Sequence, residues 1–217
     1  MARSVKRDSF IPPSYIAPDM TDEMSLRDHA RGAVRDEVLR RAWLLFAEQG
    51  FEATTVEEIA AAAGMSRRTF FRYFTGKDEL VLERLVEAGQ RIADALRDRP
   101  DDEPAWPALR AAFDVVVLPQ QENPDRSRAL QLMVRDELAV RATVLERRRR
   151  WQEMLEPLVV ARLPKRRARR SPDIRAAALT ASALACLEAA QDVWTDHPDA
   201  DLGALVDEAM STVAPLH

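Results

Sequence analysis

Cysteine and histidine are scarce in this sequence of 217 residues, which holds one cysteine and three histidines. The single Cys186 excludes an intramolecular disulfide framework and a cysteine-based zinc cluster. His29, His197 and His217 are far apart in the sequence, and none has the partner four residues away that a helical metal site would use. We therefore predict no metal site and no cofactor, and we expect the reducing cytoplasm as the compartment.

Long apolar runs and an excess of basic charge are also lacking. No run approaches the ~18 apolar residues that would cross a bilayer, and within residues 1–24 the prolines Pro12 and Pro13 interrupt the only apolar stretch, so no signal peptide is indicated. The formal net charge of −4 argues against a general binder of polyanions, so contact with nucleic acid requires a local basic patch. Nothing resembles the strained turn of a catalytic nucleophile. We expect an intracellular protein with no membrane partner and no enzymatic activity.

The distribution of proline predicts where the helices lie. No proline occurs between Pro18 and Pro100, and two further proline-free stretches span residues 125–156 and 173–197. Proline is costly inside a helix, whereas β-branched runs are short and no segment alternates apolar and polar residues over the length of a strand. The sequence therefore predicts an all-α fold of about nine helices. Residues 1–31 are expected to form a flexible N-terminal extension.

A helix–turn–helix pattern is predicted between residues 55 and 74. Thr55 and Glu58 have the spacing of a capping box, which predicts a short helix through Ala62. Gly64 permits a tight turn, and Ser66 has the position of an N-cap for a second helix that we expect to reach about Tyr73. A longer helix is expected from about residue 78. Two short helices joined by a glycine turn are the arrangement that places the second helix in the DNA major groove.

Basic charge gathers on the second helix of this pattern. Residues 66–77 contain Arg67, Arg68, Arg72 and Lys77 and no acidic side chain. Hydroxyl and aromatic groups lie among these cations, whereas Phe70 and Phe74 have the spacing of core residues. A structural helical hairpin with a solvated basic face is the alternative interpretation of the same segment. The focused charge favours a surface that contacts DNA.

The wider segment resembles the DNA-binding domain of the TetR family of bacterial transcriptional regulators. The resemblance covers about residues 32–92 and rests on Leu45-Phe46-Ala47-Glu48-Gln49-Gly50-Phe51, Thr54-Thr55-Val56 with Ile59-Ala60, Ala63-Gly64-Met65-Ser66, and Thr69-Phe70-Phe71-Arg72-Tyr73-Phe74 with Lys77 and Leu80. Beyond it, residues 93–217 match the family only as a helical domain of suitable length. The resemblance implies that this second domain binds a ligand and forms the dimer.

The resemblance also implies roles for individual residues. Thr55, Tyr73 and Lys77 would meet DNA phosphates, and a homodimer would place two recognition helices in successive major grooves of a pseudo-palindromic operator. The positions that approach the bases are Arg67, Arg68, Thr69, Phe71 and Arg72. Ser66, which precedes them, is counted with the DNA-binding residues. Arginine suits guanine through a bidentate pair, and an apolar ring suits a thymine methyl. Position 71 is more often tyrosine in the family, so a phosphate contact from that hydroxyl is missing here.

A ligand pocket is expected from the family rather than from the residues themselves. The candidates are bulky apolar groups of the second domain with a neighbouring amide: Trp106, Phe113, Leu130, Met133, Trp151, Met154, Gln191 and Trp194. Because pockets and cores use the same residue types, a side chain of this kind more often belongs to the core than to a pocket lining. A mostly apolar lining favours a hydrophobic or amphipathic effector.

Several features leave alternatives open. The last two helices, about residues 173–196 and 200–214, suit a homodimer interface or burial within the chain. The basic runs 147–150 and 165–170 are interpreted as an acid-paired cluster and a loop, with DNA contact as the alternative, and Arg3, Lys6 and Arg7 could form a minor-groove arm. The expected function is a ligand-released repressor. An activator or a ligand-indifferent DNA-binding protein is the first alternative, and a helical enzyme or binding module without DNA function is the second.

Overall fold

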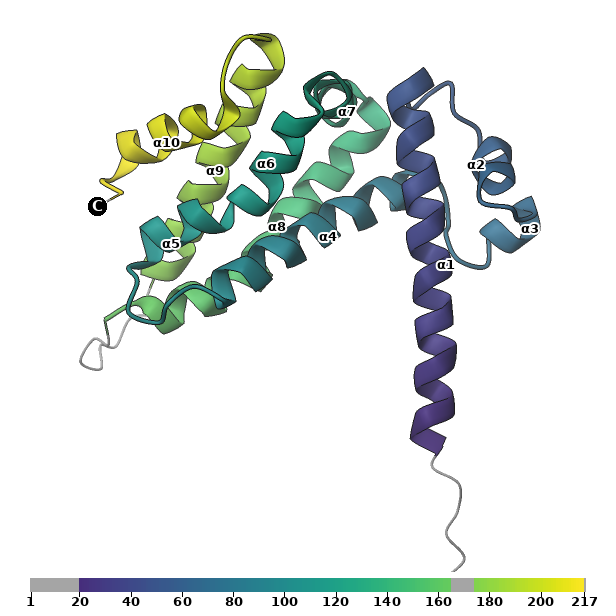
Figure 1. The fold of residues 1–217 in the computed structure, drawn as a ribbon, viewed down its shortest axis with the longest axis horizontal. Helices are drawn as coiled ribbons and strands as arrows, with labels where there is room; N and C mark the ends of the chain where they lie inside the picture. Colours follow the sequence, from purple (N-terminus) through teal and green to yellow (C-terminus); the bar gives the residue numbers. More distant parts are fainter. Residues whose placement is uncertain (1–19, 165–173, 217) are drawn as a thin grey trace, which may run out of the picture. The chain divides into compact units, whose positions relative to one another are not determined.

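The structure is a computed structural model that describes residues 20–164 and 174–216, and within these ranges it is all-α with no strand (Figure 1). Its helices are α1 (Met20–Gln49), α2 (Val56–Ala62), α3 (Arg67–Phe70), α4 (Lys77–Arg97), α5 (Ala105–Ala112), α6 (Asp114–Glu122), α7 (Pro124–Asp136), α8 (Leu138–Arg162), α9 (Arg175–Asp196) and α10 (Leu202–Val213). The helices α5 and α6 meet at Phe113, which caps both. The all-α prediction is confirmed.

The first helix begins earlier than expected. We expected a flexible extension through residue 31, but α1 begins at Met20. After Pro18 no proline interrupts the chain, and residues 20–31 are rich in types with good helix propensity. The chain divides into two units, Met1–Asp36 and Glu37–His217, so the N-terminal part of α1 belongs to the first unit. The remaining expected extension and its basic residues lie outside the described residues.

A first apolar core joins α1 to the helix–turn–helix. Phe46, Ile59, Phe70 and Phe74 are each at most 2 % exposed, and the rings of Phe70 and Phe74 lie 5.4 Å apart. The start of α4 contributes to the same cluster, as do residues of α7 and α8. The sequence placed Phe70 and Phe74 in the core, and the structure confirms it.

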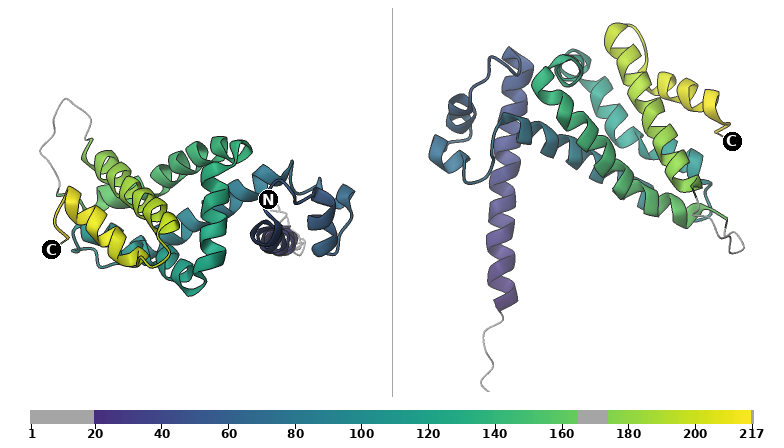
Figure 2. Two further views of the ribbon diagram at one scale, coloured as in Figure 1. Left: turned by 90° about the horizontal axis from the view of Figure 1, so that it is seen from above. Right: turned by 180° about the vertical axis from the view of Figure 1, so that it is seen from behind.

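A second core holds α4, α5, α6, α8, α9 and α10 together. Within it α4 and α8 lie side by side and run in the same direction (Figures 1 and 2). Two hydrogen bonds set their register, because Trp151 Nε1 donates to Leu85 O at 2.7 Å and Arg162 Nη2 donates to Leu96 O at 2.6 Å. The helix that follows the helix–turn–helix is therefore fixed to α8 at two points along its length.

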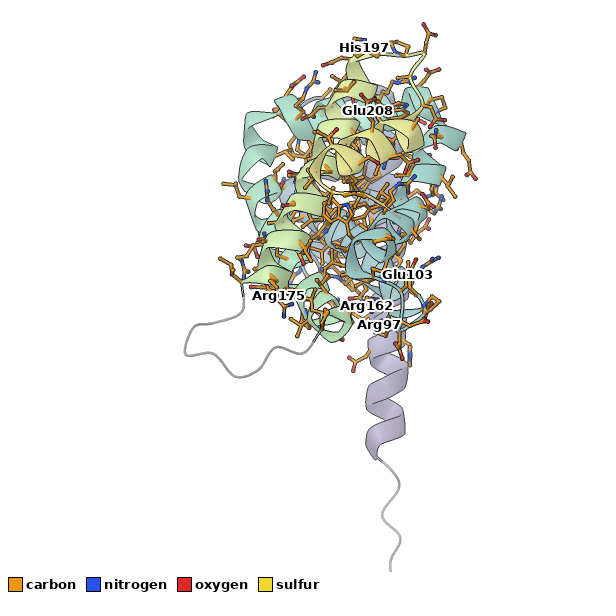
Figure 3. The ribbon with its side chains drawn as sticks, turned by 90° about the vertical axis from the view of Figure 1, so that its left-hand side faces the viewer. Arg97, Glu103, Arg162, Arg175, His197 and Glu208 are labelled. Carbon is orange, nitrogen blue, oxygen red and sulfur yellow. The ribbon has the colours of Figure 1, made fainter. Side chains whose placement is uncertain are left out.

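Charged side chains close the end of this bundle where α4 and α8 finish. Figure 3 shows Arg97, Glu103 and Arg162 at this end and His197 at the other. Arg162 also donates to Arg99 O at 3.0 Å, and Arg99 forms an ion pair with Glu103 at 2.6 Å. Among the described helices, none has the length and apolar character needed to cross a membrane.

Candidate DNA-reading surface and ligand cavity

The capping box at the start of α2 is present. Glu58 N donates to Thr55 Oγ1 at 3.2 Å, and Thr55 N donates to Glu58 Oε2 at 2.8 Å. The hydrogen bond from the Thr55 backbone, followed by that from its hydroxyl, lowers the pKa of Glu58 from its usual value. The Thr55 side chain is therefore held at the exposed N-terminus of α2, where free N–H groups favour an anion.

The turn between α2 and α3 follows the expected chemistry, but α3 is shorter than expected. Gly64 has a φ of +68°, the left-handed region that favours glycine. Ser66 caps α3, because Thr69 N donates to Ser66 Oγ at 3.1 Å. The α-helix ends at Phe70 rather than near Tyr73, since Arg72 N and Tyr73 N bond three residues back, to Thr69 O at 3.1 Å and to Phe70 O at 2.8 Å. The recognition segment is one helical turn extended by a tighter turn.

The candidate base-reading side chains lie on the exposed side of this segment. Arg67, Arg68, Phe71 and Arg72 are exposed, and Phe71 is 46 % exposed. Arg67 forms an ion pair with Glu57 at 2.8 Å and lies over the Phe71 ring at 5.5 Å. Within the described residues, Arg68 and Arg72 have no ion-pair partner. The structure thus divides the arginines into one that is engaged locally and two that are available to a ligand.

Lys77 has a structural role that the sequence did not show. Its ammonium donates to Phe51 O at 2.6 Å and lies over the Phe51 ring at 4.4 Å. The side chain is half-buried, so it ties the first residue of α4 to the turn that follows α1. An ammonium has three N–H donors. After the bond to Phe51 O, a remaining donor of Lys77 can still contact a DNA phosphate.

An arginine-rich cavity of about 290 Å³ lies among α4, α6, α7 and α8, with contributions from α1 and α9. We call it the arginine cavity, and its lining is Trp43, Arg84, Leu85, Ala88, Arg91, Val116, Pro119, Gln120, Asn123, Arg126, Ser127, Leu130, Gln131, Val134, Arg147, Trp151 and Gln191. This lining has four arginines and no carboxylate, although the chain carries a net negative charge. Apolar surface with a few convergent cationic groups suits an amphipathic anion.

The electrostatics of the cavity also favour an anion. Burial, followed by the neighbouring charge of Arg84, lowers the pKa of Arg91 from its usual value. Arg84 has Glu87 as an ion-pair partner at 2.9 Å. Among the described residues, neither Arg91 nor Arg126 has an ion-pair partner. Glu87 offsets this repulsion only in part, and an anion in the cavity would offset more of it.

Three of the eight expected ligand residues line the arginine cavity, namely Leu130, Trp151 and Gln191. The other five do not line either this cavity or its neighbour described below: Trp106, Phe113, Met133, Met154 and Trp194 pack in or against the two cores. Phe113 and Trp194 are at most 1 % exposed, because both pack into a core that several helices share. Sequence reasoning missed the arginines. The spacing of Arg84, Ala88 and Arg91 along one face of α4 is the signal that could have shown two of them.

A second cavity of about 460 Å³ adjoins the first between α7, α8 and α9. We call it the α9 cavity, and its lining is Gln131, Val134, Arg135, Val144, Leu145, Arg147, Glu188, Gln191 and Asp192. Burial raises the pKa of Asp192 from its usual value; among the smaller effects, the charge of Arg135 opposes this rise and the charge of Glu188 adds to it. Four of its residues also line the arginine cavity: Gln131, Val134, Arg147 and Gln191.

The face shared by α9 and α10 carries small and apolar side chains. A shallow groove there is lined by Ser182, Ala185, Cys186, Ala189, Ala190, Val193, Leu205, Glu208, Ala209, Thr212 and Val213. Val193 and Val213 are 44 % and 56 % exposed. Burial raises the pKa of the Cys186 thiol, so it is a small apolar group rather than a reactive one.

The basic run 147–150 is paired with acids, as expected, but one member is buried. Arg149 and Arg150 both bond to Glu146 at 2.7 Å and lower its pKa to about 2. Arg147, in contrast, is 7 % exposed rather than solvated, because it packs over the Trp151 ring at 5.2 Å. The run 165–170 lies outside the described residues.

An exposed, basic helix–turn–helix followed by a helical domain with a ligand-sized cavity defines a DNA-binding protein of the regulator class. Comparison with known families identifies it further. Residues 38–83 match the family model described as "Bacterial regulatory proteins, tetR family", and residues 103–217 match that of the "MftR C-terminal domain". The chain belongs to the TetR family of bacterial transcriptional regulators.

Named relatives are regulators that match over part of their length. The HTH-type transcriptional regulator TcmR of Streptomyces glaucescens is 39 % identical over 92 residues, which cover 42 % of this chain and 41 % of TcmR. The HTH-type transcriptional repressor KstR2 of Mycolicibacterium smegmatis is 36 % identical over 68 residues, which cover 31 % of this chain and 30 % of KstR2. The chain thus spans less than half the length of these relatives.

Solved structures share the fold over most of the chain. FadR of Bacillus halodurans aligns with a TM-score of 0.58 at 20 % identity, covering 83 % of this chain and 94 % of FadR. FadR of Thermus thermophilus, solved with lauroyl-CoA, aligns with a TM-score of 0.55 at 24 % identity, covering 82 % of this chain and 92 % of that one. At these identities the likeness establishes the fold.

Proposed function

We propose that this protein is a homodimeric repressor that reads a pseudo-palindromic operator in the bacterial cytoplasm and releases it when an amphipathic anion binds the arginine cavity. One observation carries the proposal. The helix α4 begins at Lys77, directly after the recognition segment, and its residues Arg84, Leu85, Ala88 and Arg91 then line the cavity. A single rigid element therefore belongs to both the DNA-reading surface and the ligand site.

The domain assignment follows this division. Residues 32–92 form the DNA-binding domain, with the helix–turn–helix at 55–74, and residues 93–217 form the ligand-binding and dimerisation domain. The boundary falls within α4, and the first core also takes Met133 and Val134 from α7. The two domains therefore share packing rather than a flexible linker, which suits the transmission of a conformational change.

The DNA contacts are assigned by exposure and availability. Arg68 and Arg72 read guanine edges, because both are exposed and without an ion-pair partner among the described residues. Phe71 contacts a thymine methyl, and Arg67 supports it from the Glu57 ion pair. Around them, phosphates and neighbouring sugar–phosphate edges are contacted by Thr55, Ser66, Thr69, Tyr73 and Lys77.

The effector is assigned by the lining of the arginine cavity. Trp43, Leu130 and Trp151 provide apolar surface, and Arg91 and Arg126 provide unpaired positive charge. The Thermus thermophilus FadR neighbour was solved with lauroyl-CoA and the Bacillus subtilis FadR neighbour with stearoyl-CoA. An acyl derivative with a phosphate-bearing head has the apolar and anionic parts that this cavity matches.

The dimer forms through α9 and α10. Their shared groove presents small side chains and the exposed Val193 and Val213, which suit close packing of helices against a second copy. Two copies related by a twofold axis would then present two α3 segments to one face of DNA, as a pseudo-palindromic operator requires.

Selection of bound sequences from a random duplex library, at fixed near-physiological salt, tests the operator assignment. The proposal predicts an enriched inverted repeat with half-site centres about one helical turn apart. Dodecyl phosphate, a single-chain amphipathic anion, should then release the selected duplex. If a ligand-free preparation of the protein enriched no sequence, the proposal would be contradicted. By linkage, a ligand that releases the duplex must bind the free protein more tightly than the protein–DNA complex.

A further inference from the structure

The side chain of Arg147 lies between two cavities. It belongs to the lining of both the arginine cavity and the α9 cavity, together with Gln131, Val134 and Gln191. Taken alone, the arginine cavity of about 290 Å³ lies just below the ~300–1,000 Å³ that is usual for ligand pockets. The two cavities joined would lie well within that range, so the group that separates them decides how long a ligand the protein accommodates.

The contacts of Arg147 hold it in this dividing position only in part. Its Nη2 donates to Glu188 Oε1 at 2.7 Å, and its guanidinium lies over the Trp151 ring at 5.2 Å. Its Nε, however, is buried and has no hydrogen-bond partner. A buried donor without an acceptor is unfavourable, so the observed position leaves Arg147 incompletely satisfied.

The acid that holds Arg147 has a second partner. Arg148 Nη1 donates to Glu188 Oε2 at 3.2 Å. If Arg147 moved, Glu188 would keep one arginine and would not become an unpaired charge, which is the costly outcome when a buried ion pair is broken. The Glu188 carboxylate therefore does not depend on Arg147 alone for its ion pair.

We propose that Arg147 is a specificity-determining partition that limits the chain length of the effector. While Arg147 stays on Glu188, an apolar chain entering the arginine cavity ends against Arg147 and Gln191. When Arg147 moves aside, the chain continues past Val134 into the α9 cavity, where Val144 and Leu145 offer further apolar surface. This inference rests on the proposed function, because it takes the arginine cavity as the effector site.

The experiment compares ligands of one head group and increasing chain length. Calorimetric titration of the purified full chain with octyl, dodecyl and hexadecyl phosphate, each below its micelle concentration, gives three dissociation constants. Each buried methylene contributes ~0.8 kcal/mol, or about fourfold in affinity. For the wild type we expect affinity to increase from octyl to dodecyl and then to level off, because Arg147 stops the longer chain.

Two substitutions separate the partition from a general effect on binding. Arg147→Ala opens the passage, so hexadecyl phosphate should bind at least about tenfold tighter relative to dodecyl phosphate than it does in the wild type. Arg148→Ala is the matched control, because Arg148 shares Glu188 but lines neither cavity. It should leave the ratio of the two affinities unchanged. Arg147→Leu, which fills more of the space over Trp151, is the second variant if the alanine variant is poorly folded, and it should change the ratio in the same direction.

The outcomes distinguish this inference from the function on which it rests. An unchanged hexadecyl-to-dodecyl ratio in both Arg147 variants, with clear binding, would overturn the partition and leave the effector class intact. Absence of binding for all three ligands in all proteins would overturn the proposed effector class, and the partition with it. Because a loss of head-group affinity raises all three dissociation constants by the same factor, the ratio is insensitive to it.

Discussion

The helix–turn–helix and the arginine cavity are built over different ranges of the sequence. In the first, the bonds that shape the site join residues three apart, as between Thr55 and Glu58 or Ser66 and Thr69. The second brings Trp43 of α1 together with Gln191 of α9. A surface shaped by local bonds can be inferred from a short segment, whereas a cavity depends on how distant helices pack.

The largest expected effect tests the local surface. Arg68→Ala or Arg72→Ala should weaken operator binding by ~1–3 kcal/mol, or about fivefold to 150-fold, and relax preference at one base pair. Fluorescence anisotropy with the selected operator and with single-base variants measures both. Arg97→Ala, which removes an exposed arginine paired with Asp94 on α4, is the control. Equal losses on every duplex would reduce Arg68 and Arg72 to phosphate contacts.

A second prediction concerns the contact that joins the two regions. A Cβ added at Gly89 of α4 would overlap Trp151 Cδ1, so Gly89→Ala must displace the indole and its bond to Leu85 O. Overpacking of this kind costs ~1–3 kcal/mol, which exceeds the gain of ~0.5–1 kcal/mol from replacing a helical glycine. Urea denaturation should therefore show a net loss of stability.

The control for Gly89 is another helical glycine. Gly32 of α1 has no atom within 4 Å of an added Cβ, so Gly32→Ala should raise stability slightly. If both substitutions changed the free energy of unfolding in the same direction, the close approach of α4 and Trp151 would be refuted. If the destabilised Gly89→Ala variant still bound operator but dodecyl phosphate no longer released it, the coupling between the ligand site and the DNA-reading surface would depend on this contact.

A smaller effect is expected from the cavity arginines. Replacing Arg91 and Arg126 together by alanine should weaken dodecyl phosphate binding about tenfold, since hydrogen bonds to charged groups contribute ~1.5–3 kcal/mol each when fully formed and these side chains are partly screened. Stability without ligand should not fall, because Arg91 lies near the like charge of Arg84. Calorimetry measures the binding of dodecyl phosphate, and thermal unfolding measures the stability of the ligand-free protein. A loss of stability without ligand would argue for a structural role of Arg91 and Arg126.

The smallest effect is an acid dependence of the α2 cap. The pKa of Glu58 is lowered in the folded state, so its contribution is fully present above the unfolded value of about 4.3 and is lost as the pH falls through the folded value. Glu58→Gln should remove this part of the pH dependence of unfolding. Glu52→Gln, an exposed change outside the cap, should retain it, and identical acid profiles for all three proteins would contradict the assignment.

Much of the DNA-reading region could be predicted from the sequence. The capping box at Thr55, the glycine turn at Gly64 and the cap at Ser66 follow from local backbone chemistry, and the structure has all three. The end of α3 was placed too late, because the change to tighter hydrogen bonds after Phe70 has no residue signature. The role of Lys77 was also missed, since its acceptor Phe51 O lies on a different turn.

The ligand region was predicted less well for a physical reason. Trp106, Phe113 and Trp194 are residue types that occur in pockets as well as in cores. In the structure several helices enclose them, and all three belong to the second core. The sequence analysis did not consider Arg91 and Arg126, which come from α4 and α7 and line one cavity although they are far apart in the sequence. Apolar periodicity shows which face of a helix is buried and does not show what buries it.

The most direct test of the account measures the affinity of the selected operator for the full-length protein with and without saturating dodecyl phosphate, and the affinity of that ligand for free and operator-bound protein. Coupling of ~1–3 kcal/mol would lower both affinities by one common factor, between about fivefold and 150-fold. The account predicts that common factor. A ligand that binds the free protein and its operator complex equally well would contradict it.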